Sequence, residues 1–131
     1  MLQGSCHCGR LGWRVDARPA SATICNCTTC RRYGVLWVYG FEGEDVALEG
    51  DSNIYVNDSG RLEFHFCPTC GCLAAWRAVD PYDDGRRRIA VNLRLSEDQD
   101  SIRTIPLDRF DGLETFEQLP RDGRTVGDLL V

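Results

Sequence analysis

The chain has 131 residues, of which 43% are hydrophobic and 27% are charged, a composition that is ordinary for one soluble globular domain. No apolar stretch reaches the roughly 18 residues that a membrane-spanning helix needs, and the formal net charge of −5 disfavours non-specific binding to nucleic acid or to a membrane surface. We therefore expect a single domain over residues 1–131, with no nucleic-acid partner and no membrane partner.

Six stretches of the sequence have the composition of β-strands. Residues 11–16 alternate apolar and polar side chains, which places Leu11, Trp13 and Val15 on one face. Residues 34–41 form a continuous run of β-forming side chains bounded by glycine, which is typical of a buried strand. The predicted strands, in chain order, are 11–16, 34–41, 53–58, 61–66, 72–79 and 88–95.

Helices are expected only as short turns, after Cys27, in 96–104 and near the C-terminus. The tail over residues 105–131 is rich in turn-forming and acidic residues, and we expect it to wrap the sheet. The pattern predicts an all-β fold of short antiparallel strands in one domain. Turn signals separate the strands at 49–53, 57–61 and 80–86.

Eight cysteines are the most informative feature of the composition. The first residues lack the basic and apolar segments of a secretory signal, so we expect a cytoplasmic location, where thiols stay reduced. Clustered cysteines in such a compartment favour metal binding over disulfides, and the spacings of ferredoxin clusters are absent, which favours zinc. The three clusters are Cys6 and Cys8; Cys25, Cys27 and Cys30; and Cys67, Cys70 and Cys72.

The stretch "CPTCGC" predicts half of a closed zinc site. Its proline and glycine favour a tight turn from which Cys67 and Cys70 can bind one metal ion. Cys6 and Cys8, which glycine also follows, supply a second pair of thiolates. A site with four thiolates is closed and structural, and it contributes directly to the free energy of folding.

The stretch "CNCTTC" brings together only three cysteines, Cys25, Cys27 and Cys30. If Cys72 joined them, the chain would hold two closed sites and would have a purely structural role. If Cys72 is instead a small buried hydrophobic residue, as free cysteine usually is, the second site keeps an open position. An open position is the mark of a zinc ion that takes part in chemistry.

The stretches "GSCHCG", "CNCTTCRRYG" and "FHFCPTCGC" together resemble the glutathione-dependent formaldehyde-activating (GFA) family. The resemblance spans residues 4–72 and implies a β-tent fold. It also implies two zinc ions per chain, a structural ion on Cys6, Cys8, Cys67 and Cys70 and a labile ion on Cys25, Cys27 and Cys30. The activity that it implies is the formation of S-(hydroxymethyl)glutathione from glutathione and formaldehyde.

Several other residues near the cysteines are candidates for the site. Arg31 and Arg32 follow Cys30 directly and could bind the carboxylates of glutathione, or could instead screen the zinc–thiolate centre. His7 is expected to be exposed between two ligands, and His65 to be a half-buried or supporting group rather than a ligand. Trp37 and Tyr39 are expected in the core or in a pocket wall, without a chemical role.

These observations predict a zinc-dependent carbon–sulfur lyase that adds formaldehyde or a related small aldehyde to glutathione or a similar thiol. Cys25, Cys27 and Cys30 would be the catalytic residues, because their zinc ion would hold the incoming thiol as a thiolate. Two alternatives remain: a glutathione-binding or carrier protein without catalytic activity, and a purely structural, zinc-ribbon-like interaction module. A module of that kind requires that another group close the second site.

Overall fold

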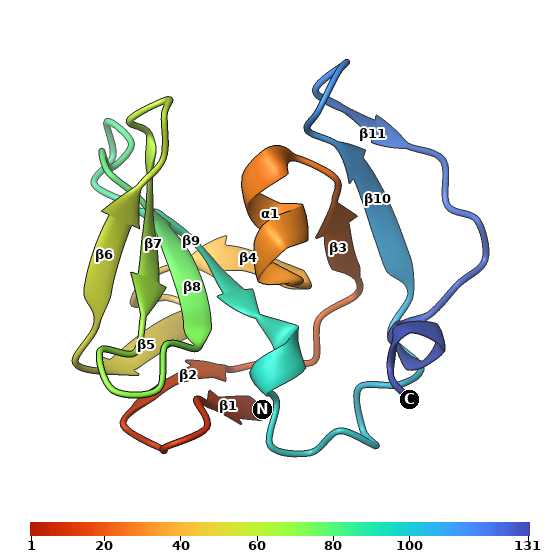
Figure 1. Cartoon of the computed structure of the whole chain (residues 1–131), viewed down its shortest axis with the longest axis horizontal. Coiled ribbons are helices and arrows are strands. Elements are labelled where there is room, and N and C mark those ends of the chain that lie inside the picture. The colour runs from red at the N-terminus through yellow and green to blue at the C-terminus, as the bar shows by residue number, and fades with distance from the viewer.

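Eleven short β-strands in two sheets form the framework of the protein, whose computed structural model describes residues 1–131 (Figure 1). One α-helix and two 3₁₀ turns complete the fold. The strands are β1 (Leu2–Ser5), β2 (Leu11–Val15), β3 (Ala22–Cys25), β4 (Trp37–Phe41), β5 (Val46–Gly50), β6 (Asn53–Val56), β7 (Leu62–Phe66), β8 (Leu73–Ala78), β9 (Arg88–Asn92), β10 (Leu107–Asp111) and β11 (Glu117–Leu119). The helical elements are α1 (Thr28–Tyr33), η1 (Leu93–Leu95) and η2 (Val126–Leu129).

The smaller sheet has three antiparallel strands in the order β1-β2-β5. The predicted alternation in β2 is confirmed, because Leu11, Trp13 and Val15 are all buried while the residues between them are partly exposed. The indole N–H of Trp13 donates to the carbonyl of Asn92 at 3.1 Å. This hydrogen bond links the smaller sheet to the end of β9 in the larger sheet.

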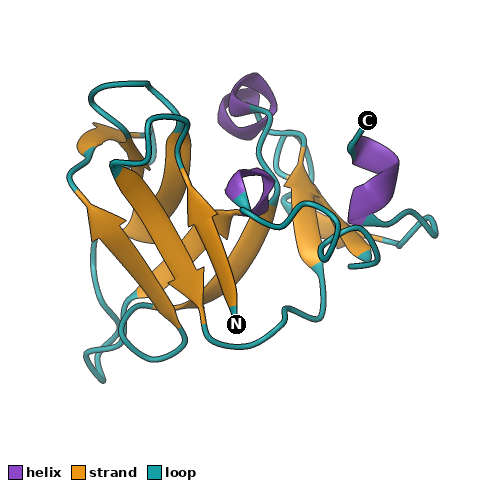
Figure 2. Cartoon of the chain, turned by 90° about the horizontal axis from the view of Figure 1, so that it is seen from below, coloured by secondary structure: helices purple, strands orange, loops and turns teal.

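The larger sheet has eight strands in the order β11-β10-β3-β4-β9-β8-β7-β6. All its pairings are antiparallel except that of β3 with β10, which is parallel. Its central strands are apolar because both of their faces are covered. In Figure 2 the strands fall into two groups, with helical turns between and beside them.

Two apolar clusters lie inside the fold. A cluster of 19 buried residues fills the space between the sheets and includes Trp13, Leu36 and Leu107. A second cluster, of 7 buried residues, includes the buried residue of α1 and consists of Cys30, Val35, Trp37, Phe64, Leu73, Trp76 and Ala90. The second cluster matters for function because one of its members, Cys30, belongs to the cysteine group of "CNCTTC".

Helix α1 is a short helix whose two ends are both fixed by local chemistry. The Cys27 side chain caps its N-terminus by accepting a hydrogen bond from the backbone N–H of Cys30. Gly34 ends it in the left-handed conformation, at φ 66° and ψ 40°, which glycine adopts at little cost. The cap places Cys27 at the start of the helix and Cys30 on its buried side.

The all-β prediction is confirmed, and each of the six predicted strands is present, with shifted ends. The expected run 34–41 begins as a strand only at Trp37, and the run 88–95 ends at Asn92, where η1 starts. Five further strands, β1, β3, β5, β10 and β11, were not predicted. The tail does not merely wrap the sheet, because β10 and β11 extend it by two strands. No helix in the structure is long and apolar enough to cross a membrane.

Candidate metal centres

The first cysteine group joins two turns that are distant in the sequence. Cys6 and Cys8 lie in the turn between β1 and β2, and Cys67 and Cys70 lie in the turn between β7 and β8. The sulfur atoms of the four lie within 4.8 Å of one another. The Sγ atom of Cys8 is 3.6 Å from that of Cys6 and 3.5 Å from that of Cys67. These distances are far too long for a disulfide bond, and this first group could hold a metal ion.

Backbone N–H groups point at the sulfurs of the first group. Leu11 donates to Sγ of Cys6 at 3.3 Å, and Thr69 donates to Sγ of Cys67 at 3.4 Å. The backbone N–H of Cys70 lowers the pKa of the Cys67 thiol, and that of Cys72 lowers the pKa of Cys70 to about 5. Such donors stabilise the thiolate, which is the form that binds metal ions.

The second group consists of the three cysteines of "CNCTTC". Cys25 ends β3, Cys27 caps α1 and Cys30 lies in its first turn. Their sulfur atoms also lie within 4.8 Å of one another, and no fourth cysteine, histidine or carboxylate joins them. This second group could therefore hold a metal ion on three side chains.

The second group also receives N–H donors, one of them from a side chain. The backbone N–H of Cys30 donates to Sγ of Cys27 at 3.2 Å, and the indole N–H of Trp37 donates to Sγ of Cys30 at 3.3 Å. A hydrogen bond from the Cys30 thiol lowers the pKa of Cys25 to about 6. That hydrogen bond and burial raise the pKa of Cys30 itself. Cys25 is thus more readily ionised than Cys30.

The turn between β10 and β11 packs directly on the second group. A Cβ atom at Gly112 would lie 2.8 Å from Sγ of Cys25 and 2.9 Å from Cβ of Cys27, so only glycine allows this close approach. The Asn26 side chain donates to Oδ1 of Asp111 at 3.1 Å and accepts from the backbone N–H of Leu113, also at 3.1 Å. The residue between the first two cysteines is therefore held in place by the C-terminal hairpin.

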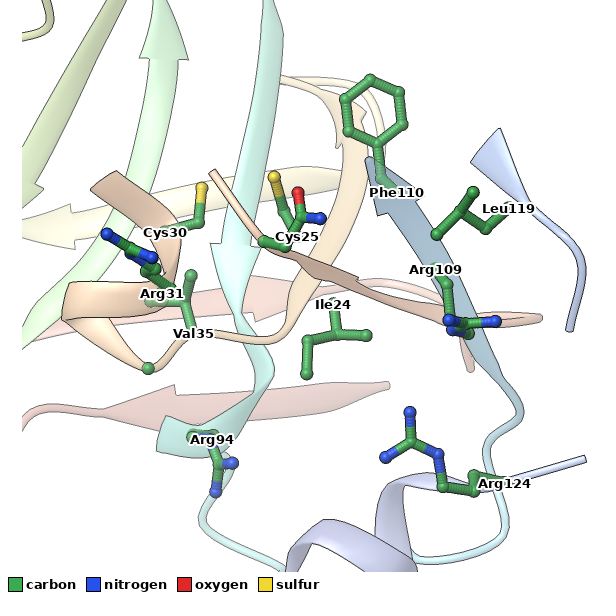
Figure 3. Close-up of a pocket in the computed structure, with 12 residues that line it drawn as sticks. Ile24, Cys25, Cys30, Arg31, Val35, Arg94, Arg109, Phe110, Leu119 and Arg124 are labelled. Atoms are coloured by element: carbon green, nitrogen blue, oxygen red, sulfur yellow. The ribbon is translucent and has the colours of Figure 1, made fainter. Parts of the chain in front are cut away.

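A cleft of about 380 Å³ opens beside the second group (Figure 3). This volume is within the range of small-molecule sites. Arg31 lines the cleft, whereas Arg32 does not and instead donates to the carbonyl of Thr28 at 2.8 Å. The lining residues are Ile24, Cys25, Asn26, Cys30, Arg31, Gly34, Val35, Arg94, Arg109, Phe110, Leu119 and Arg124.

Cys72, His7 and His65 do not belong to the second group. Cys72 packs partly buried against the larger apolar cluster and is not a member of either cysteine group. His7 is exposed. His65 is buried, and its ring nitrogens bond to the Ser52 hydroxyl at 2.7 Å and to the Glu63 carboxylate at 2.9 Å. None of the three supplies a further ligand to the second group.

The sequence did not predict which residues surround the second group. Trp37 was expected to be inert, yet it donates to a cysteine sulfur. The "FDG" turn at 110–112 and three arginines of the cleft, Arg94, Arg109 and Arg124, were not singled out at all. The "DG" pair in that turn was the one available signal, since it marks a tight turn. The arginines are far from Cys30 in the sequence and gave no local signal.

Comparison with known proteins places these features in a family. The family model described as "Glutathione-dependent formaldehyde-activating enzyme" matches residues 1–105. No curated protein matches the chain. A crystal structure of a Rhodobacter sphaeroides protein is similar in fold, with a TM-score of 0.60, 23% sequence identity, and coverage of 80% of this chain and 98% of that one. The match covers both cysteine groups, and the chain belongs to the glutathione-dependent formaldehyde-activating enzyme family.

Proposed function

We propose that the protein is a zinc-dependent carbon–sulfur lyase that adds formaldehyde or a related small aldehyde to glutathione or a similar thiol. One observation carries the proposal: three cysteines of a GFA-family chain converge without a fourth side-chain ligand, and two of them line a cleft. We place the protein in the cytoplasm, where its eight free cysteines would stay reduced.

The sulfur spacing of the first group suits zinc. Four thiolates at about 2.3 Å from a tetrahedral zinc ion lie about 3.8 Å apart, and the sulfur atoms of Cys8 and Cys6 are already 3.6 Å apart. Zinc here would be structural, because Cys6, Cys8, Cys67 and Cys70 would fill all four positions. It would fix the turn between β1 and β2 to the turn between β7 and β8.

The second group would hold an exchangeable zinc ion on Cys25, Cys27 and Cys30. The ion would supply the positive charge that keeps an incoming thiol deprotonated and nucleophilic at neutral pH. The protein's own contribution is to orient the three sulfurs, through the cap on α1, the Trp37 N–H and the packing of Gly112. A guanidinium at the cleft, that of Arg31, would bind a substrate carboxylate. The role suggested for Arg32 stays a prediction.

The reaction itself needs little from the surrounding residues. The thiolate sulfur attacks the aldehyde carbon, a C–S bond forms, and the carbonyl electron pair moves to oxygen, which takes a proton. The cleft is lined by no aspartate, glutamate or histidine, so we assign that proton to water. Positioning of the two reactants is then the main source of rate enhancement.

The same absence of an acid–base residue supports a second candidate function, a thiol carrier without catalytic activity. A purely structural module is less well supported, because Cys72 does not close the second group.

Exchange NMR separates a catalyst from a carrier. Glutathione and formaldehyde interconvert with the hemithioacetal, and the exchange rate is measured with and without zinc-loaded protein. A catalyst raises the rate in proportion to protein concentration, and Cys27→Ser removes the increase. A carrier binds glutathione and leaves the rate unchanged, which would overturn the lyase proposal.

A further inference from the structure

Apart from the cysteines themselves, the charged residues that line the cleft beside the second cysteine group are all basic. Four of its lining residues are arginines and none is acidic. They come from separate parts of the fold: Arg31 from α1, Arg94 from η1, Arg109 from β10, and Arg124 from the loop before η2. The convergence of four guanidinium groups is notable in a chain whose net charge is −5, because it creates a local positive field on an acidic protein.

Most of this charge is not compensated within the protein. Arg31 and Arg94 are exposed and take part in none of the ion pairs. Arg109 and Arg124 share one carboxylate, that of Asp122, at 3.6 Å and 3.0 Å. Asp122 is therefore the only carboxylate that pairs with any of the four arginines, which leaves guanidinium donors free for a ligand.

The cysteines and two of the arginines lie on opposite sides of the cleft. In Figure 3 the sulfur atoms of Cys25 and Cys30 lie on one side, Arg94 and Arg124 lie on the other, and Ile24 lies between them. A ligand with its sulfur at the cysteines would pass apolar side chains before its far end met the guanidinium groups. Guanidinium groups prefer carboxylates and phosphates, which they bind with two parallel hydrogen bonds.

We infer that the cleft selects a thiol that carries two or more anionic groups and no cationic group beside them, with Arg94, Arg109 and Arg124 as specificity residues. The thiol part of this inference rests on the proposed function. An ammonium group, such as that of the γ-glutamyl end of glutathione, meets no carboxylate among the lining residues. Arg109 and Arg124 lie beyond residues 1–105, which the family model matches, whereas Arg94 lies within them.

The test compares two probes that differ only at the amino group, which is an ammonium in S-methylglutathione and a neutral acetamide in N-acetyl-S-methylglutathione. Calorimetric titration of the zinc-loaded protein gives the affinity of each. We expect the N-acetyl probe to bind about fivefold more tightly or better, the scale of one partly exposed charge contact. Equal affinities, or tighter binding of S-methylglutathione, would overturn the inference and would mean that the arginines only screen the cysteine group.

Substitutions of the cleft arginines test whether the cleft is the source of the selectivity. Arg94→Gln and Arg124→Gln should each weaken the N-acetyl probe about fivefold and reduce the salt dependence of its binding. Arg61→Gln makes the same change in net charge on the exposed turn between β6 and β7 and should leave the affinity unchanged. If Arg61→Gln weakened binding as much as the cleft variants do, long-range charge and not the cleft would be responsible.

The proposed lyase activity and the proposed selectivity of the cleft can each be contradicted without the other. Neither probe has a free thiol, so their binding does not depend on aldehyde addition. The exchange measurement with glutathione and formaldehyde tests that addition without reference to the arginines.

Discussion

The indole N–H of Trp37 lies 3.3 Å from the Sγ atom of Cys30, and both residues are buried in the same apolar cluster. A thiolate in apolar surroundings is costly unless donors solvate it. Trp37 supplies such a donor from a fixed ring, which also holds the sulfur in one position. A residue that packs in the core thereby also holds one sulfur of a group that could bind a metal ion.

Removing this donor should weaken the second site alone. Trp37→Phe keeps an aromatic ring but loses the N–H, and we expect zinc at the second group to bind about tenfold more weakly, as for other partners of metal ligands. Competition with a chromophoric chelator measures the loss. Trp76→Phe is the matched control, because Trp76 packs edge-on against Trp37 in the same cluster. An equal loss in both variants would show that packing, and not the hydrogen bond, matters.

At the scale of elements, the β10–β11 turn is held together by one carboxylate. Oδ1 of Asp111 accepts from the backbone N–H groups of Leu113 and Glu114, and Oδ2 accepts from the backbone and hydroxyl of Thr115. Oδ1 also accepts from Asn26. The donors, the Glu114 N–H first, hold the pKa of Asp111 well below its usual range. The turn that packs on the second cysteine group therefore depends on an ionised aspartate.

The thermal stability of the protein should depend on whether Asp111 is ionised. A carboxylate with a lowered folded-state pKa stabilises the fold fully above its unfolded pKa, about 3.9, and the contribution is lost as the pH falls toward the folded value. The difference in Tm between the wild type and Asp111→Asn should be largest above pH 5 and should shrink below pH 4. Glu114→Gln, an exposed change in the same turn, is the control and should show a small difference throughout. A difference for Asp111→Asn that is constant with pH would contradict the account.

The elements also show why the sequence predicted some parts of the site and not others. The members of each cysteine cluster are neighbours in the sequence, so their spacing alone indicated a shared centre. Strand β10, "LDRFD", was missed because charged side chains interrupt its apolar residues, and β3 has only four residues. The Asn26–Asp111 contact joins residues 85 positions apart. Only the assembled sheet, in which β10 pairs with β3, brings the hairpin and the cleft arginines to the cysteines.

At the scale of the whole molecule, the two cysteine groups have different relations to the fold. The first group connects turns 59 residues apart through Cys8 and Cys67, and it lies against the larger apolar cluster. The second group lies within a single segment, from the end of β3 to α1. A metal ion at the first group would thus restrict the whole chain, whereas one at the second would restrict a local loop.

Cysteine variants should separate these roles. Cys67→Ser should prevent folding, because a structural zinc site contributes about 10–16 kcal/mol in small zinc domains and a domain is stable by only about 5–15 kcal/mol. Cys27→Ser should fold and lose one zinc ion. Circular dichroism and elemental analysis of both variants test this. If Cys27→Ser unfolded the protein as thoroughly as Cys67→Ser, the second site would be structural as well.

The central claim, that Cys25, Cys27 and Cys30 form an open, thiol-responsive metal site, is tested most directly by the zinc content per chain. Elemental analysis before and after dialysis against millimolar glutathione gives that number. We predict two zinc ions at first, one per cysteine group, and then either loss of one ion or retention of both with glutathione bound at the second group. Two zinc ions that are indifferent to glutathione, with no glutathione bound, would contradict the claim and would make the protein a scaffold.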